Sequence, residues 1–193
     1  MRVNDYFDAV YVINLDRRTD RMERLDTQLK NLGIEYERFS AVDALEENIP
    51  PYIAGKLSHQ KVLEQLNGQK ALILEDDALF VEGFQEAFDK VMEYLPSDWD
   101  VFYLGVLLQP RIGKLVQVNK HWHRQVVSVA MHSYCVNPHQ ANFFASELDK
   151  YDGWVDVCFR LLADKTKAYV VQPNLVTQFP SFSDLRLTEV DDF

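Results

Sequence analysis

The chain has 193 residues and a mass of 22.5 kDa, with 47% hydrophobic and 26% charged residues. This composition excludes an intrinsically disordered polypeptide, and the length favours one domain over two. Thirty acidic side chains against twenty basic ones give a formal net charge of -10. Such acidity argues against general binding to nucleic acid, which needs a basic surface. It leaves open a phosphate-bearing ligand held locally by a pair of arginines.

The start of the chain and its cysteines predict a cytoplasmic protein. The apolar run 10–13 is too short for a secretory signal, and Asp5 and Asp8 precede it where a signal carries positive charge. No stretch of the sequence approaches the roughly 18–20 apolar residues of a membrane span. Cys135 and Cys158 stand among apolar neighbours, so we expect both to be buried and reduced.

Strand-like and helix-like segments alternate along the first half. Apolar runs predict strands over 11–15, 35–39, 70–74 and 100–108. Apolar residues at three- and four-residue spacing predict helices from Thr19 or Asp20 to Gly33, from Ser58 to about 66, and over 84–95. The segment 43–55 reads as a loop, because Pro50 and Pro51 interrupt it. This alternation is typical of an α/β domain with a mostly parallel central sheet flanked by helices.

The second half is less regular. We expect a hairpin of 115–118 with 125–130, a strand over 134–136, a helix from Pro138 to Leu148 and a late strand over 169–171. No linker or repeat separates the halves, so we predict a single domain over 1–193, with a regular half 1–108 and a less regular half 109–193.

The acidic triplet Glu75-Asp76-Asp77 directly follows a predicted buried strand. Open α/β sheets bind ligands at the carboxyl ends of their strands. Adjacent carboxylates repel one another, and a bound cation offsets that repulsion. Carboxylate oxygens suit Mn²⁺ or Mg²⁺, particularly an ion that also holds phosphate oxygens. The alternative is a solvated turn whose acidic residues cap the next helix.

A second candidate site begins with Asn14, Asp16 and Arg17 at the end of the first strand. Arg21 is four residues beyond Arg17, so the two guanidinium groups could share one face of a helix near its start and bind phosphate. The alternative is that these arginines are exposed and pair with Asp20 or other acidic neighbours.

Other polar residues give weaker signals. The pair Ser58-His59 could contact a ligand, although a single histidine is more often a satisfied core or surface residue. His121 and His123 have no obvious third ligand for zinc. The sequence contains no nucleophile elbow, Walker loop or dinucleotide-binding glycine pattern.

Taken together and in order, these segments resemble glycosyltransferase family 25, which includes lipopolysaccharide-type and collagen β-galactosyltransferases. The segments that carry the resemblance are 10–18, 20–21, 39–44, 55–59 and 71–78, with weaker matches at 100–105, 134–136 and from 172–173 to 183–184. Two features depart from the family pattern. The family usually has a cysteine shortly before the Ser-His pair, and it prefers glycine at the position of Ala44.

The resemblance implies a GT-A-like nucleotide-sugar fold, a uridine diphosphate (UDP) sugar as donor, Mn²⁺ or Mg²⁺, and inversion at the anomeric carbon. The transferred sugar would be a hexose, with galactose favoured, and the acceptor a glycan or a hydroxylated group. The residues 1–108 would bind the donor, and 109–193 would face the acceptor. The implied metal ligands are Asp77 and Glu75, and the implied donor-binding residues are Asn14, Asp16, Arg17, Arg21, Ala41, Asp43, Ser58, His59, Glu75 and Asp76.

An inverting enzyme also needs a base that accepts the proton of the acceptor hydroxyl. We predict Asp156 for this role, because Trp154 next to it could stack on a sugar ring. The alternative is that Asp156 is the N-cap of a helix over 157–162. Two other functions stay open: a non-catalytic module that binds a UDP-sugar, and a metal-dependent hydrolase or nucleotidyltransferase that uses the same acidic strand end.

Overall fold

An eight-stranded sheet forms the centre of the computed structural model, which describes residues 2–107, 114–127, 131–183 and 188–190. The order of its strands is β2-β1-β3-β8-β5-β9-β7-β6. The pairings show that β8 and β7 run opposite to the other six strands. The predicted α/β fold with a mostly parallel sheet is therefore confirmed. The strands of this sheet are β1 Ala9–Asn14, β2 Glu37–Ser40, β3 Ala71–Glu75, β5 Val101–Tyr103, β6 Lys114–Gln117, β7 Trp122–Val127, β8 Ser133–Val136 and β9 Ala168–Val171.

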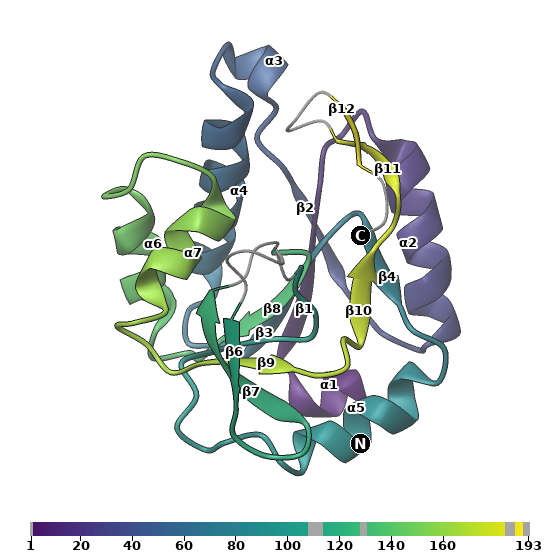
Figure 1. Cartoon of the computed structure of the whole chain (residues 1–193). Coiled ribbons are helices and arrows are strands. Elements are labelled where there is room, and N and C mark those ends of the chain that lie inside the picture. The colour runs from purple at the N-terminus through teal and green to yellow at the C-terminus, as the bar shows by residue number, and fades with distance from the viewer. Residues whose placement is uncertain (1, 108–113, 128–130, 184–187, 191–193) are drawn as a thin grey trace.

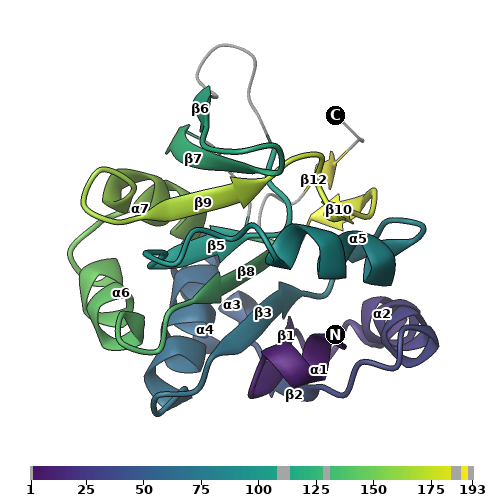
Figure 2. The ribbon, with the colours of Figure 1, turned by 90° about the horizontal axis from the view of Figure 1, so that it is seen from below.

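Helices cover both faces of the sheet (Figures 1 and 2). Successive side chains of a strand point to opposite faces, so Val10 and Val12 pack on one side and Tyr11 and Ile13 on the other. The first side is covered by α1 Val3–Tyr6, α2 Thr19–Asn31 and α5 Phe84–Met92. The second is covered by α4 Pro51–Gln65, α6 Ala141–Leu148 and α7 Val155–Leu162, with the short α3 Ala44–Glu47 preceding α4.

Two short pairs of strands lie outside the main sheet. β4 Ala78–Phe80 pairs antiparallel with β10 Val176–Gln178, and β11 Ser181–Ser183 pairs with β12 Thr188–Val190. The backbone packs closely where β10 passes the end of β5, since a Cβ on Gly105 would lie 1.7 Å from the carbonyl oxygen of Val176. Glycine at 105 therefore lets β10 reach the edge of the sheet where β3 ends.

The predicted elements of the second half also form. β6 and β7 make the expected hairpin, β8 and β9 are the expected strands, and α6 matches the helix predicted from Pro138. Residues 128–130 of the predicted hairpin, Leu108 of the predicted strand and Asp184 of the late matching segment lie outside the described residues. Both cysteines are buried, as predicted. Within the described ranges, none of the helices combines the length and the apolar character needed to cross a bilayer.

The prediction for the segment 43–55 was wrong. Two helices, α3 and α4, form there, and α4 begins at Pro51 rather than at Ser58. Proline fits the first turn of a helix because its missing N–H would have no partner there and its φ is already helical. Ser58 therefore lies inside α4 and is not a cap.

Candidate functional site

The triplet Glu75-Asp76-Asp77, which we call the acidic turn, lies at the carboxyl end of β3 as predicted. It links β3 directly to β4, which starts at Ala78. Glu75 is the last residue of the strand and pairs with Ile13, so its side chain shares the face that packs against α4. Asp76 faces the opposite layer, where α2 lies. Strand geometry thus separates carboxylates that are neighbours in the sequence.

Asp76 is tied into the protein by its own partners. Arg21 Nη1 of α2 donates to Oδ1 at 2.7 Å, and Asn14 Nδ2 at the end of β1 donates to Oδ2 at 2.8 Å. The side chains of Asp76 and Arg21 are each only 9% exposed. Burial raises the pKa of Asp76, and the charge and hydrogen bond of Arg21 oppose that rise. Asp76 therefore joins β3 to α2 and β1.

Glu75 is held from the other side. His59 Nε2 of α4 lies 3.1 Å from Glu75 Oε1, and His59 Nδ1 lies 2.9 Å from the hydroxyl of Tyr134 on β8. Burial alone would raise the pKa of Glu75, but the hydrogen bond and charge of His59 outweigh it and leave that pKa below its usual range. The side chain of Glu75 is 22% exposed, so part of its carboxylate remains accessible to a ligand.

Asp77 is the member of the acidic turn without a direct cationic partner among the described residues. Its Oδ1 is buried without a hydrogen bond, and its Oδ2 accepts a long hydrogen bond of 3.3 Å from Gln178 Nε2. Burial, together with the charges of Glu75 and Asp76, raises the pKa of Asp77 to about 8. A carboxylate in this setting has the vacant oxygen and the uncompensated charge that suit a divalent cation.

The segment after β10 covers the acidic turn. Phe179 N donates to the carbonyl oxygen of Asp77 at 2.7 Å, and the guanidinium of Arg24 on α2 stacks 3.8 Å above the Phe179 ring. The acidic turn is therefore in contact with a segment that lies about a hundred residues later in the sequence.

The residues predicted around the nucleotide form a second network at the ends of β1 and β2. Arg17 Nε donates to Asp43 Oδ2 at 2.7 Å, and Asp43 caps α3 by accepting from Leu45 N at 2.9 Å. Ala41 N donates to the carbonyl oxygen of Asn14 at 3.0 Å. The expectation that Arg17 and Arg21 share a helix face was wrong, because α2 begins at Thr19 and Arg17 precedes it.

Ser58 supports this network from α4. Its Oγ donates to the carbonyl oxygen of Ala54 at 2.8 Å and accepts from Val42 N at 2.9 Å. Ser58 is 2% exposed. Its hydrogen bonds hold the strand-to-helix loop around Val42 in place. A direct contact of Ser58 with the donor stays a prediction.

A hollow of about 480 Å³ opens beside this network. Asn14 and Asp16, both predicted donor-binding residues, lie in its wall. The full lining is Asn14, Asp16, Thr19, Met22, Glu23 and Arg38. Arg38 on β2 donates to Asn14 Oδ1 at 2.9 Å and pairs with Asp16, which lowers the pKa of Asp16.

Asp156 lies in the first turn of α7, and its Oδ1 accepts from Val157 N at 2.7 Å. The helix begins at Val155 with Trp154 at the N-cap, so the alternative in which Asp156 is the N-cap was wrong. The charge of Asp156 adds to the rise that burial causes in the pKa of Tyr103, which places Asp156 near that buried ring. Its role as a base stays a prediction.

Three residues of the site were missed by the sequence analysis: Arg38, Tyr134 and Gln178. Arg38 lies within a predicted strand and could have been paired with Asp16 by charge. Tyr134 and Gln178 reach the site through pairings between strands that are far apart in the sequence, so no local sequence pattern predicts their contacts. Within the described ranges, no three or more His, Cys, Asp or Glu side chains are grouped so that they could hold a metal ion by themselves.

Known proteins are similar to part of this chain. Residues 7–60, from β1 to the middle of α4, match the family profile described as glycosyltransferase family 25 (LPS biosynthesis protein). Human procollagen galactosyltransferase 2 is 29% identical over 129 residues, which cover 51% of this chain and 21% of that protein. Over about half of its length, the chain is thus similar to members of glycosyltransferase family 25.

Further relatives are similar at the same level. A putative glycosyltransferase, R655, of Acanthamoeba polyphaga mimivirus is 32% identical over 121 residues, covering 50% of this chain and 37% of that protein. The human inactive glycosyltransferase 25 family member 3 is 30% identical over 129 residues, covering 51% and 22%. The matches thus span between a fifth and somewhat over a third of these relatives, one of which is named as inactive.

Solved structures show a looser likeness. The protein A197 from STIV aligns with 100% of this chain and 96% of its own, with 18% identity and a TM-score of 0.48. A UDP-glucose pyrophosphorylase complexed with UDP-glucose aligns with 85% of this chain and 72% of its own, with 8% identity and a TM-score of 0.49.

Proposed function

We propose that this chain is a metal-dependent, inverting glycosyltransferase that moves a hexose, galactose, from a UDP-sugar to a lipopolysaccharide-type glycan or another hydroxylated acceptor. The observation that carries the proposal is the buried, unpartnered Oδ1 of Asp77 at the carboxyl edge of the sheet. The relation to family 25 supports the donor class, since relatives in that family are named galactosyltransferases.

The charges of the acidic turn agree with a bound Mn²⁺ or Mg²⁺. Arg21 compensates Asp76 and His59 holds Glu75, whereas Asp77 lacks a direct cationic partner among the described residues. Asp77 and the outer oxygen of Glu75 would hold the ion. Such ions often take only one or two carboxylates from the protein, with water and the phosphates of the substrate as the remaining ligands. When bound, the ion supplies positive charge that stabilises the leaving diphosphate.

The protein's own residues would orient the donor. The hollow beside Asn14 and Asp16 offers polar groups to the uridine part, and Arg38 keeps both of these side chains in place. Ala41, Asp43 and Arg17 lie next to it in the sequence-predicted donor site, and the side chain of Arg17, which is 41% exposed, would contact a phosphate of the donor. Arg21 acts through Asp76 rather than by direct contact.

Asp156 is our candidate for the base. Its carboxylate lies in the first turn of α7, where Oδ1 accepts a hydrogen bond from Val157 N. Trp154 is 36% exposed and lies 5.9 Å from the ring of Tyr52, so two aromatic rings border this position. Such rings commonly pack against the apolar face of a sugar, which would bring the acceptor hydroxyl near Asp156.

A second candidate is a module that binds a UDP-sugar without transferring it. It is favoured by one observation: a relative named as inactive matches the chain as well as the relatives named as transferases. A hydrolase or nucleotidyltransferase would use the same acidic turn but release monophosphate or pyrophosphate instead of UDP. For any of these functions we propose a cytoplasmic protein, because both cysteines are buried and unpaired.

The test is a panel of UDP-sugars incubated with the protein and Mn²⁺, with released UDP quantified. We expect slow hydrolysis of UDP-galactose without an acceptor and faster release with a suitable acceptor. Asp77→Asn should abolish the release, while Asp26→Asn, the same change at a position in α2 that pairs with Lys30, should leave it unchanged. Binding without release would favour the non-catalytic module, and pyrophosphate as the product would favour a nucleotidyltransferase.

A further inference from the structure

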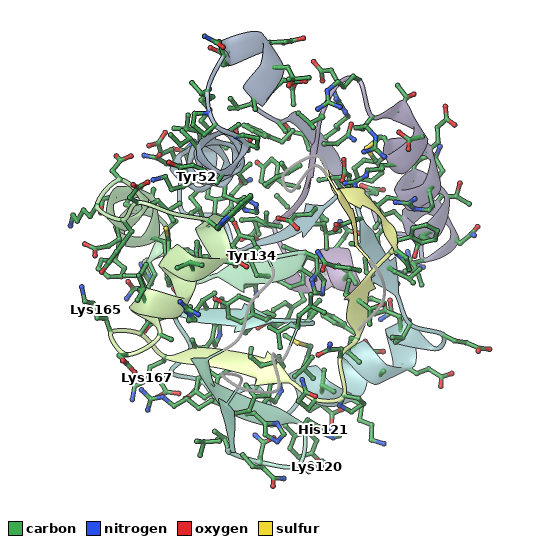
Figure 3. All side chains as sticks on the ribbon, turned by 45° about the horizontal axis from the view of Figure 1, so that its top comes forward. Tyr52, Lys120, His121, Tyr134, Lys165 and Lys167 are labelled. Atoms are coloured by element: carbon green, nitrogen blue, oxygen red, sulfur yellow. The ribbon has the colours of Figure 1, made fainter. Side chains whose placement is uncertain are left out.

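A buried chain of three polar side chains runs through the layer between the sheet and α4. Tyr134 on β8, His59 on α4 and Glu75 on β3 are joined by contacts of 2.9 and 3.1 Å. Tyr134 is fully buried and His59 is 2% exposed. Figure 3 shows Tyr134 near the centre of the molecule, far from the labelled surface residues Lys120 and Lys167.

The positions of the protons along the hydrogen-bonded series Tyr134–His59–Glu75 follow from its donors and acceptors. An ionised carboxylate can only accept a hydrogen bond, and Glu75 Oε1 lies 3.1 Å from Nε2 of His59. In the tautomer that donates from Nε2, the Nδ1 of the same ring is an acceptor, and it lies 2.9 Å from the hydroxyl of Tyr134. Tyr134 remains a phenol because burial raises its pKa well above the usual value, and its hydroxyl donates to that Nδ1. Each donor in the series thus faces an acceptor: the Tyr134 hydroxyl faces His59 Nδ1, and His59 Nε2 faces Glu75 Oε1.

We propose that Tyr134 is a positioning residue of the donor site: its hydroxyl fixes the ring of His59, and the ring holds Oε1 of Glu75 so that Oε2 faces the donor and its metal ion. This inference rests on the proposed function for the role of Glu75. The link from Tyr134 to His59 stands on the geometry alone.

The packing explains why Tyr134 can serve as a fixed reference point. β8 lies between β3 and β5, so Tyr134 has a strand on each side, with Ile73 opposite it on β3 and Tyr103 opposite it on β5. Its ring lies 5.4 Å from that of Phe159 on α7, and it is close to the ring of His59, at 5.7 Å. Close packing of this kind restricts the motion of the side chain. Its hydroxyl can therefore hold the ring of His59, on α4, in one orientation.

Tyr103 provides a matched control. It is a buried tyrosine on the neighbouring strand β5, and its hydroxyl has no hydrogen-bond partner among the described residues. Tyr103→Phe and Tyr134→Phe remove the same atom from adjacent positions of one sheet. Only the second change breaks the chain to His59. A role of Tyr134 in packing alone predicts that the two variants behave alike.

The test is nitrogen and proton NMR of the ring of His59 in protein labelled with ¹⁵N-histidine, with the resonances assigned by their loss in His59→Gln. In the native protein we expect a protonated Nε2 with a slowly exchanging proton. In Tyr134→Phe the Nδ1 resonance should shift because its donor is lost, and the Nε2 proton should exchange about tenfold faster. Tyr103→Phe should change neither.

Turnover is the second measurement. With the donor and Mn²⁺ used above, kcat/KM for UDP release should fall about tenfold in Tyr134→Phe and stay within about twofold in Tyr103→Phe. Unchanged His59 resonances in Tyr134→Phe would overturn the inference, as would equal losses of turnover in the two variants. If the native protein releases no UDP from any donor, the proposed function fails, and the NMR measurement still decides whether Tyr134 fixes His59.

Discussion

Replacing Asp77 by asparagine should stabilise the metal-free protein while it removes the metal site. The reason is that Oδ1 of Asp77 is buried without a hydrogen bond and the side chain lies beside Glu75 and Asp76. An ionised carboxylate there is unfavourable in the folded protein until a cation arrives. Asparagine has nearly the same shape and carries no charge, so the unfavourable interaction disappears along with the affinity for the cation.

The size of the effect follows from the pKa. In the unfolded chain Asp77 titrates near its ordinary value of 3.8, and in the folded protein its pKa is about 8. Between these values the unfolded chain binds fewer protons than the folded one, so the free energy of unfolding falls as the pH rises. The full difference corresponds to at most about 6 kcal/mol. Because Asp77 is partly open to solvent, screening reduces it, and we expect about 2–3 kcal/mol above pH 8.

The assay is urea unfolding of the native protein and of Asp77→Asn at pH 5, 6.5 and 8, with a chelator present throughout. The stability advantage of Asp77→Asn should be small at pH 5 and grow up to pH 8. Asp76→Asn is the contrasting variant, because it removes the carboxylate that forms a buried ion pair with Arg21. We expect that variant to be less stable than the native protein by about 3 kcal/mol.

The reasoning would be refuted if Asp77→Asn were no more stable than the native protein at pH 8, or if its advantage did not change with pH. The reasoning would also fail if Asp77→Asn and Asp76→Asn changed the free energy of unfolding in the same direction. That result would mean that the negative charge of Asp76 is no better balanced by nearby positive charge than that of Asp77. Adding Mn²⁺ should raise the unfolding temperature of the native protein and leave that of Asp77→Asn unchanged.

Two further changes test how the site is built. Gly105→Ala places a Cβ 1.7 Å from the carbonyl oxygen of Val176, so β10 must move. We expect the free energy of unfolding, measured with urea, to fall by about 3 kcal/mol or more. An unchanged free energy of unfolding would contradict the close packing. Ser58→Ala removes the acceptor of Val42 N and should cost about 1–2 kcal/mol while raising the KM for the donor; an unchanged KM would show that the loop at Val42 does not shape the site.

Much of the fold could be predicted because its signals are local. Alternating apolar runs and helical spacing located β1, α2, β3 and α5 to within a few residues. The carboxyl-edge position of the acidic turn followed from the strand that precedes it. The error at Pro50 and Pro51 arose because proline both interrupts and begins helices, and the sequence alone does not say which.

The sequence by itself determined that three carboxylates follow a buried strand in an acidic α/β protein. Only the tertiary structure decided which of them is compensated. Arg21 reaches Asp76 from α2, and His59 reaches Glu75 from α4, because strand alternation sends these two side chains to opposite layers. The antiparallel insertion of β8 then brings Tyr134 to His59 across 75 residues of sequence. These contacts depend on how distant segments pack, so no local pattern could reveal that Asp77 is the carboxylate left for a cation.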